Sequence, residues 1–119
     1  MTRYVDGYIL PLPKKNIGAY RDMAATAGKV WKEHGALEYI ECIAEDVKPG
    51  KVTSFPQAVK LEEGETVVFG WVVFESRAER DRINALVMQD PRLAGMNPKT
   101  MPFDTMRMFW GGFELFVEA

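Results

Sequence analysis

The chain has 119 residues, 47% of them hydrophobic and 12% aromatic, which is enough to bury the core of one domain over residues 1–119. Its formal net charge is −2, and acidic and basic residues are interspersed without a basic stripe, so we expect no nucleic-acid partner. One cysteine and one histidine exclude an internal disulfide framework and a Cys/His zinc site within one chain. We predict no metal site.

The N-terminus lacks the cationic segment and long apolar run of a signal peptide. No apolar stretch approaches the roughly 20 residues that a membrane-spanning helix needs. We therefore expect a cytoplasmic protein with no membrane partner.

The first half of the chain predicts a strand, a helix and a second strand. Residues 4–13 (YVDGYILPLP) are apolar and aromatic and end at two prolines, which is typical of a strand. Residues 14–34 change to helical spacing, and Gly35 follows as a C-terminal cap. The apolar stripe of this helix consists of Ile17, Tyr20, Ala24, Ala27 and Trp31. Residues 36–45 predict a strand, although their alternation is imperfect.

The second half begins with an irregular connection over residues 46–65, and connections of this length often serve in binding or assembly. Residues 66–75 (TVVFGWVVFE) predict the clearest strand of the chain. A second helix follows at 76–90, where Ser76 and Glu79 have the spacing of a capping box. Another irregular connection, 91–104, leads to a final strand at 105–119.

The order βαββαβ predicts an α+β fold, the ferredoxin-like plait, with a four-stranded antiparallel sheet and two helices on one face. The third strand is apolar on both sides, with Val67, Phe69, Trp71 and Val73 opposite Val68, Val72 and Phe74. The last strand is also apolar on both sides. Two helices cover only one face of the sheet, so we expect a second copy of the chain to cover the other, giving a homodimer.

Four separated stretches resemble, in order, the bacterial domain-of-unknown-function family 1428. They are YVDGYILPLPKKN (4–16), SFPQAVKL (54–61), ETVVFGWVVFES (65–76) and MPFDTMRMFWGGFE (101–114). The resemblance implies the dimeric α/β-barrel superfamily, which agrees with the dimer expected from the two-sided sheet. It implies no activity. The wider superfamily includes cofactor-independent monooxygenases, haem-degrading enzymes and isomerase-like proteins, but none of their catalytic motifs is carried over to a residue here.

His34 is the only histidine and lies in the middle of the apolar helix stripe, so we expect it to face the sheet. It is our candidate catalytic residue, as a general base or a group that orients a ligand in a pocket between helix and sheet. The alternative, which we favour, is a hydrogen-bonded core histidine that locks the helix end to a strand.

Asp6 and Tyr8 share one face of the first strand, which is central in the plait. A carboxylate on a central strand is costly to bury unless it is paired, and Arg107 on the neighbouring last strand is a possible partner. Together with His34, Asp6 and Tyr8 could bind or deprotonate a phenol or an enol, and Asp6, Tyr8 and Arg107 are candidate ligand contacts. The favoured alternative is a structural ion pair beside an anchored tyrosine.

Glycines occur in three strands expected to be neighbours, at Gly7, Gly70 and Gly111–Gly112. Missing side chains on adjacent strands could open a cavity walled by Trp71 and Trp110, our remaining candidate ligand contacts. The alternatives are that the glycines relieve crowding where the sheet coils, and that the tryptophans belong to the core or a dimer contact.

Two functional hypotheses follow. The first is a homodimer that binds a small, flat, apolar or enolic molecule without a cofactor, with monooxygenase-like or isomerase-like chemistry if it is an enzyme. The second is a non-catalytic assembly module without a pocket of roughly 300 Å³. Haem ligation by His34 is a third and less favoured hypothesis.

Overall fold

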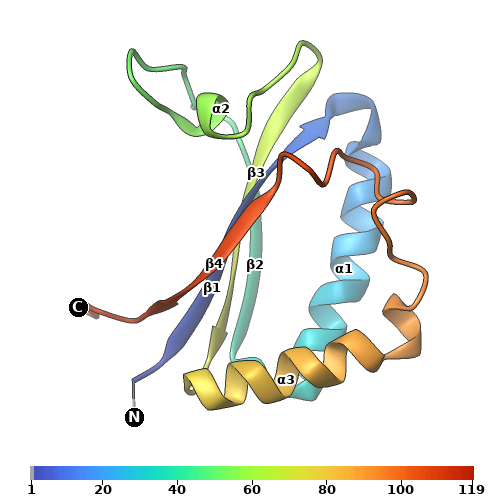
Figure 1. Ribbon diagram of the computed structural model, residues 1–119, viewed down its shortest axis with the longest axis vertical. Coiled ribbons are helices and arrows are strands. Elements are labelled where there is room, and N and C mark those ends of the chain that lie inside the picture. The colour runs from blue at the N-terminus through green and yellow to red at the C-terminus, as the bar shows by residue number, and fades with distance from the viewer. Residues whose placement is uncertain (1) are drawn as a thin grey trace.

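The computed structural model describes residues 2–119, in which two long helices cover one face of a four-stranded antiparallel sheet (Figure 1). The strands are β1 (Tyr4–Pro13), β2 (Glu38–Ile43), β3 (Glu65–Phe74) and β4 (Phe109–Glu114). The helices are α1 (Ile17–His34), α2 (Phe55–Ala58) and α3 (Arg77–Gln89), with 3-10 turns at Lys14–Asn16 and Pro91–Leu93. The strand order is β2-β3-β1-β4. This confirms the predicted ferredoxin-like plait and the central place of the first strand.

The register of the central strand decides which side chains face the helices. Tyr8 of β1 lies opposite Gly70 of β3 on one side and Trp110 of β4 on the other. Because side chains alternate along a strand, Tyr4, Asp6 and Tyr8 share one face, and the contacts of Asp6 with α3 identify it as the helix face.

The core between the helices and the sheet has two parts. One joins α1 and α3 to β3, and its fully buried members include Val30, Phe74 and Val87. The other surrounds Leu10 and Leu12 near the start of α1. Burying such side chains contributes about 1.5–3 kcal/mol each, so these contacts hold the two helices on the sheet.

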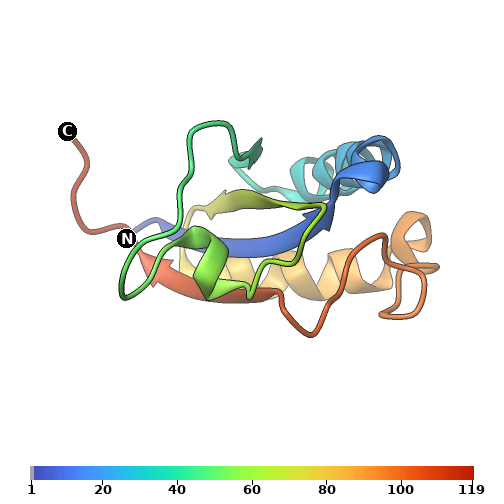
Figure 2. The ribbon, with the colours of Figure 1, turned by 90° about the horizontal axis from the view of Figure 1, so that it is seen from above.

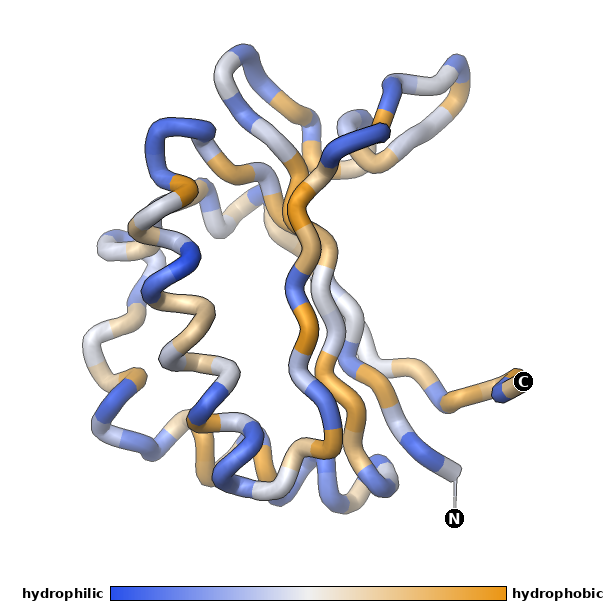
Figure 3. The backbone as a smooth tube through the Cα atoms, turned by 180° about the vertical axis from the view of Figure 1, so that it is seen from behind, coloured by the Kyte–Doolittle hydropathy of each residue, from blue (hydrophilic) through white to orange (hydrophobic). Residues whose placement is uncertain are grey.

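The other face of the sheet has no layer of long helices, as Figures 1 and 2 show from two directions, and most of its side chains are apolar. We call it the open face. Phe69, Phe109 and Phe113 project from it with 41%, 46% and 63% of their surface exposed. Orange segments mark apolar residues along these strands in Figure 3. The predicted two-sided apolar pattern of β3 is therefore confirmed.

The predicted helix ends are confirmed in part. Gly35 caps α1 with φ of 121°, a conformation that favours glycine. At the start of α3, the Ser76 hydroxyl accepts a hydrogen bond from the Glu79 backbone N–H at 3.2 Å. The Glu79 carboxylate instead accepts two hydrogen bonds from Arg82, at 2.6 and 3.1 Å. The second bond of the capping box, in which this carboxylate would accept the Ser76 backbone N–H, was therefore predicted wrongly.

The two connections also differ from the prediction. Residues 46–65 contain the single-turn helix α2, whose N-terminus is capped by Ser54. Phe55 of α2 packs edge to face on Phe69 at 6.0 Å between ring centroids, so α2 lies on the open face. The last strand starts later than predicted because Asp104 accepts the backbone N–H of Met106 and forms a turn before it. Within residues 2–119, no helix is long and apolar enough to cross a membrane.

Candidate functional site

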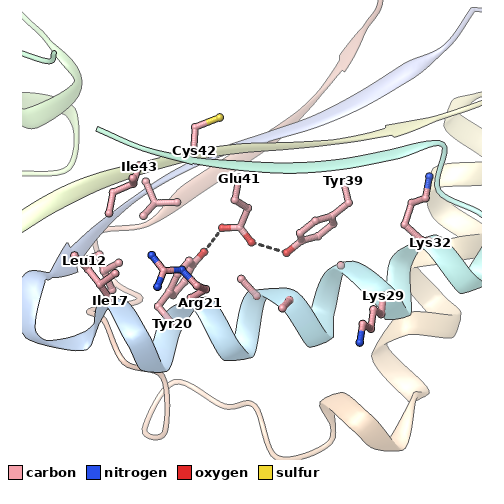
Figure 4. A pocket seen from close by; sticks show the side chains of 14 residues that line it. Leu12, Ile17, Tyr20, Arg21, Lys29, Lys32, Tyr39, Glu41, Cys42 and Ile43 are labelled. Atoms are coloured by element: carbon pink, nitrogen blue, oxygen red, sulfur yellow. Dashed lines mark hydrogen bonds between the residues drawn. The ribbon is translucent and has the colours of Figure 1, made fainter. Parts of the chain in front are cut away.

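Three tyrosines and one glutamate converge between α1 and the sheet, and we call them the Tyr–Glu cluster. Tyr39 and Glu41 come from β2, Tyr20 from α1 and Tyr8 from β1. The Tyr39 hydroxyl donates to one Glu41 oxygen at 2.6 Å, and the Tyr20 hydroxyl donates to the other (Figure 4). Each oxygen of this carboxylate therefore already accepts a phenolic proton.

Two glycines make the cluster possible. A Cβ atom on Gly70 would lie 2.5 Å from Tyr8 Cζ, and one on Gly28 would lie 2.9 Å from Tyr39 Cδ1. Both distances are too short for carbon atoms, so only glycine lets these rings lie flat against the neighbouring strand and helix. The rings of Tyr8 and Tyr39 are thereby fixed in place by the backbone around them.

The tyrosines of the cluster remain protonated donors. Burial raises the pKa of Tyr20 and of Tyr39 well above the ordinary tyrosine value, and the Glu41 charge raises both further. Burial also raises the pKa of Tyr8, with contributions from Tyr39 and Glu41. Although Tyr39 is near enough to influence Tyr8, the buried Tyr8 hydroxyl has no hydrogen-bond partner within residues 2–119.

Two cavities meet at the cluster. The outer cleft, about 550 Å³, lies between α1 and β2, with Arg21, Lys29 and Lys32 along α1 (Figure 4). The inner cavity, about 300 Å³, extends from the cluster beneath α1 toward α3 and β4. Tyr20, Ala24, Tyr39 and Glu41 line both. The cluster therefore stands at the boundary between a cleft with a basic rim and an apolar interior.

The inner cavity has soft, aromatic walls. Its aromatic side chains outside the cluster are Trp31, Phe103 and Trp110. Five methionines also line it, namely Met23, Met88, Met96, Met101 and Met108. Methionine is flexible and polarizable, so such walls adapt to the outline of an apolar guest. The size and lining are typical of a site for a small, flat molecule.

Asp6 forms a polar network at the edge of the inner cavity. It accepts hydrogen bonds from Arg80 at 2.9 Å and from Asn84 at 3.2 Å, both on α3. Burial raises its pKa, while Asn84 and Arg80 act in the opposite direction. The predicted partner Arg107 was wrong. It precedes β4 and binds Glu65 through two contacts of 2.7 Å, because the turn at Asp104 directs it away from β1.

His34 lines neither of these two cavities, as far as residues 2–119 define them. Its Nε2 atom lies 3.0 Å from Asp90 Oδ2, at the end of α3. The predicted hydrogen bond at the helix end is present, but its partner is the C-terminal cap of α3 rather than a strand, and the His34 side chain is 26% exposed rather than part of the core. The expectation that His34 faces the sheet was wrong, because α3 crosses beneath the last turn of α1 (Figure 1).

The two tryptophans point to opposite faces. Trp110 is on the helix face and lines the inner cavity, whereas Trp71 lies on the open face and donates to Glu38 at 2.8 Å. The strand glycines do not open the predicted cavity. The Tyr8 ring occupies the space at Gly70, and the Tyr4 ring occupies the space at Gly112.

Of the predicted site residues, Asp6, Tyr8 and Trp110 thus share one cavity, while His34, Trp71 and Arg107 lie elsewhere. Sequence reasoning missed Tyr39 and Glu41. The signal was present in β2, because Tyr39, Glu41 and Ile43 alternate on one face and an acid among inward-facing residues is unusual. Within residues 2–119, no group of three or more His, Cys, Asp or Glu side chains is placed to hold a metal ion.

Comparison with protein families matches residues 3–105 to the family described as "Protein of unknown function (DUF1428)". Among curated relatives, the uncharacterized protein YbaA of Escherichia coli K12 is 47% identical over 116 residues, covering 98% of both chains. The same protein name and identity are found in Shigella flexneri.

Solved structures share the fold at low sequence identity. A dimeric ferredoxin-like protein from an uncultured marine organism superposes with a TM-score of 0.67 at 10% identity, covering 100% of each chain. A NIPSNAP family protein of unknown function from Agrobacterium tumefaciens gives a TM-score of 0.57 at 16% identity, covering 96% of this chain and 88% of that one. These matches support the architecture and carry no function across.

Proposed function

The chain belongs to the DUF1428 family of proteins of unknown function, and we propose that it binds a small, flat, largely apolar or enolic molecule in the inner cavity and acts as a homodimer. Asp6, Tyr8 and Trp110 remain proposed ligand contacts, joined by Glu41. No cofactor is part of the proposal. A cytoplasmic location and the absence of a nucleic-acid partner stay predictions.

The observation that carries the proposal is the composition of the inner cavity. A space of about 300 Å³ is lined by aromatic and methionine side chains, and its polar lining includes three tyrosines and the carboxylates of Asp6 and Glu41. Apolar walls with a few converging polar groups are the usual composition of a small-molecule site. If the guest is also transformed, the ionisable groups of the lining that do not donate to Glu41 are Asp6, Tyr8 and Glu41 itself, and His34 is not among them. This favours an isomerase-like proton transfer within the cavity.

The homodimer is supported by the open face. Three exposed phenylalanines project from its strands, and α2 packs beside them through Phe55. A neighbour with the same fold is described as dimeric. A second copy is the simplest cover for a sheet face of this composition.

The second candidate, a non-catalytic assembly module, is favoured by the same open face. It requires no pocket, and the inner cavity is the feature that it leaves unexplained. The two candidates therefore differ in whether a flat molecule binds under α1.

The test uses 2-acetylnaphthalene as probe and methyl-labelled methionines as reporters. Binding in the inner cavity is expected to shift the methyl signals of its five methionines, while Met106, which is 89% exposed and outside both cavities, serves as internal reference. Equal shifts at Met106 would indicate non-specific association.

A matched pair of variants on α1 completes the test. Ala24→Phe fills the cavity boundary, whereas Ala19→Phe places the same ring on the exposed side of the helix. We expect Ala24→Phe to weaken probe binding at least about tenfold and Ala19→Phe to leave it unchanged. If wild type binds no flat bicyclic probe up to its solubility limit, the assembly module is the better function.

A further inference from the structure

The Tyr8 hydroxyl is a hydrogen-bond donor without an acceptor. It is buried beside the inner cavity and has no partner within residues 2–119. A buried donor without a partner costs roughly 1–3 kcal/mol, which proteins seldom tolerate unless something else completes the bond. The hydroxyl packs directly against the backbone of Gly70, where a Cβ atom would lie only 2.6 Å from its oxygen.

Among residues 2–119, no neighbouring group completes this bond at hydrogen-bond geometry, although the Tyr39 hydroxyl is close enough to raise the pKa of Tyr8. The Glu41 oxygens accept from Tyr20 and Tyr39, and these two hydroxyls direct their protons at Glu41 rather than into the cavity. High pKa values keep all three phenols protonated at neutral pH. The Tyr8 proton is therefore available to a guest with an acceptor atom, in competition with the Tyr39 hydroxyl oxygen.

The charge of the cavity argues against an anionic guest. Its lining contains two acids, Asp6 and Glu41, and no lysine, arginine or histidine. Arg80 offsets Asp6 at 2.9 Å, but Glu41 forms no ion pair among the described residues. A bound carboxylate would lie near an uncompensated negative charge in a site of low polarity, where repulsion is strong.

We infer that the inner cavity selects uncharged, flat molecules with a carbonyl-type oxygen, such as an aromatic ketone, aldehyde or quinone, whose oxygen accepts a hydrogen bond from Tyr8. This inference rests on the proposed function and defines its ligand class. The cluster supplies the polar contact, the methionines and aromatic rings enclose the apolar remainder, and Glu41 excludes acids of the same shape.

Three probes of nearly equal shape separate these contributions. They are 2-acetylnaphthalene, 2-isopropenylnaphthalene, in which a CH2 group replaces the carbonyl oxygen, and 2-naphthoate, which is an anion at neutral pH. Dissociation constants are measured by calorimetry for wild type, Tyr8→Phe and Tyr4→Phe. Tyr4 lies on the same face of β1 but lines neither cavity, so Tyr4→Phe is the matched control.

We expect Tyr8→Phe to weaken the ketone roughly three- to tenfold and to leave the isopropenyl compound within about twofold, the loss expected for one hydrogen bond. Tyr4→Phe should change neither. Wild type should bind naphthoate at least about tenfold more weakly than the ketone, and Glu41→Gln should narrow that gap.

The outcomes distinguish the two levels of the proposal. If Tyr8→Phe weakens the binding of both neutral probes equally, or of neither, the role of Tyr8 is overturned and the ligand pocket remains. Naphthoate binding as tightly as the ketone would overturn the selection against anions. If none of the three probes binds wild type, the proposed function itself fails.

Discussion

At the scale of single residues, the site depends on how many donors share one acceptor. Glu41 accepts from Tyr20 and Tyr39, and Tyr8 is left over although it lies in the same cluster. Removing a hydroxyl from each tyrosine therefore has different consequences for stability. A bond to a charged group is worth more than one between neutral groups, whereas an unpaired buried hydroxyl is a net cost.

We predict that Tyr39→Phe lowers the free energy of unfolding by about 1.5–3 kcal/mol, because a hydrogen bond to a carboxylate is lost. Tyr8→Phe should leave it unchanged or raise it by about 1 kcal/mol, because no bond is lost. Urea unfolding at neutral pH and fixed protein concentration measures both. Similar losses in the two variants would mean that a bound water or ligand already accepts the Tyr8 proton.

A second residue-scale prediction concerns Asp90, where the end of α3 meets α1. Hydrogen bonds from Arg92, and then from His34, hold the pKa of Asp90 well below the ordinary value. A carboxylate with a lowered folded pKa stabilises the fold above its unfolded pKa of about 3.9, and this contribution is lost as pH falls below it.

Asp90→Asn should therefore reduce stability at neutral pH and flatten the decline in stability below about pH 4. Urea midpoints between about pH 2.5 and 7 measure this change. Asp22→Asn, at an exposed position of α1, controls for the loss of one negative charge. A variant with the same acid slope as wild type would contradict the contribution of Asp90.

At the scale of elements, the separation of strand and helix depends on where glycine occurs. Gly70 on β3 and Gly28 on α1 accept the rings of Tyr8 and Tyr39, so these positions decide how closely the layers approach. Gly7 is also in a central strand, but a Cβ there would contact only Phe113 at an ordinary 3.9 Å. Replacement by alanine is therefore expected to destabilise the protein at Gly70 and to have little effect at Gly7.

We predict that Gly70→Ala destabilises the protein by about 1–3 kcal/mol, since the new methyl group overlaps a ring that the core holds in place. Gly7→Ala should be near neutral. Chemical unfolding of both variants provides the measurement, and ligand titration should show weakened probe binding only for Gly70→Ala. Equal effects would indicate that backbone flexibility, not the Tyr8 ring, determines the need for glycine.

At the scale of the whole molecule, one face of the sheet lies under α1 and α3, while the other carries only α2 (Figures 1 and 2). Phe69 on the open face and Leu86 on α3 have similar exposed fractions, 41% and 39%. They lie on opposite sides of the molecule, so the pair separates an effect of the open face from a general effect of surface hydrophobicity.

If the open face joins two copies, Phe69→Glu should convert a dimer into a monomer at micromolar concentration, because it would bury an unpaired charge in the contact. Leu86→Glu should remain dimeric. Light scattering with size-exclusion chromatography measures both. A wild-type chain that is monomeric under these conditions would overturn the dimer.

Local patterns in the sequence were sufficient to predict the order of strands and helices, the plait, and the apolar character of both faces of β3. These features depend on local periodicity, which is 2 in a strand and 3.6 in a helix, so a few neighbouring residues suffice to reveal them. The Gly35 cap and the Ser76 cap are equally local, because their partners lie within one turn.

Which side chains meet depends on the tertiary fold and could not be read from local patterns. Asp6 pairs with Arg80, 74 residues away, and His34 pairs with Asp90, 56 residues away. Those partners depend on the register of four strands and on the path of α3 beneath α1, which no local pattern encodes. The Tyr–Glu cluster has the same origin, since β1, β2 and α1 each contribute residues to it. Gly70 and Gly28 leave the space that the rings of Tyr8 and Tyr39 occupy. The partners within the cluster are chosen by long-range packing, and that is why the histidine, the most conspicuous residue of the sequence, lies outside the site.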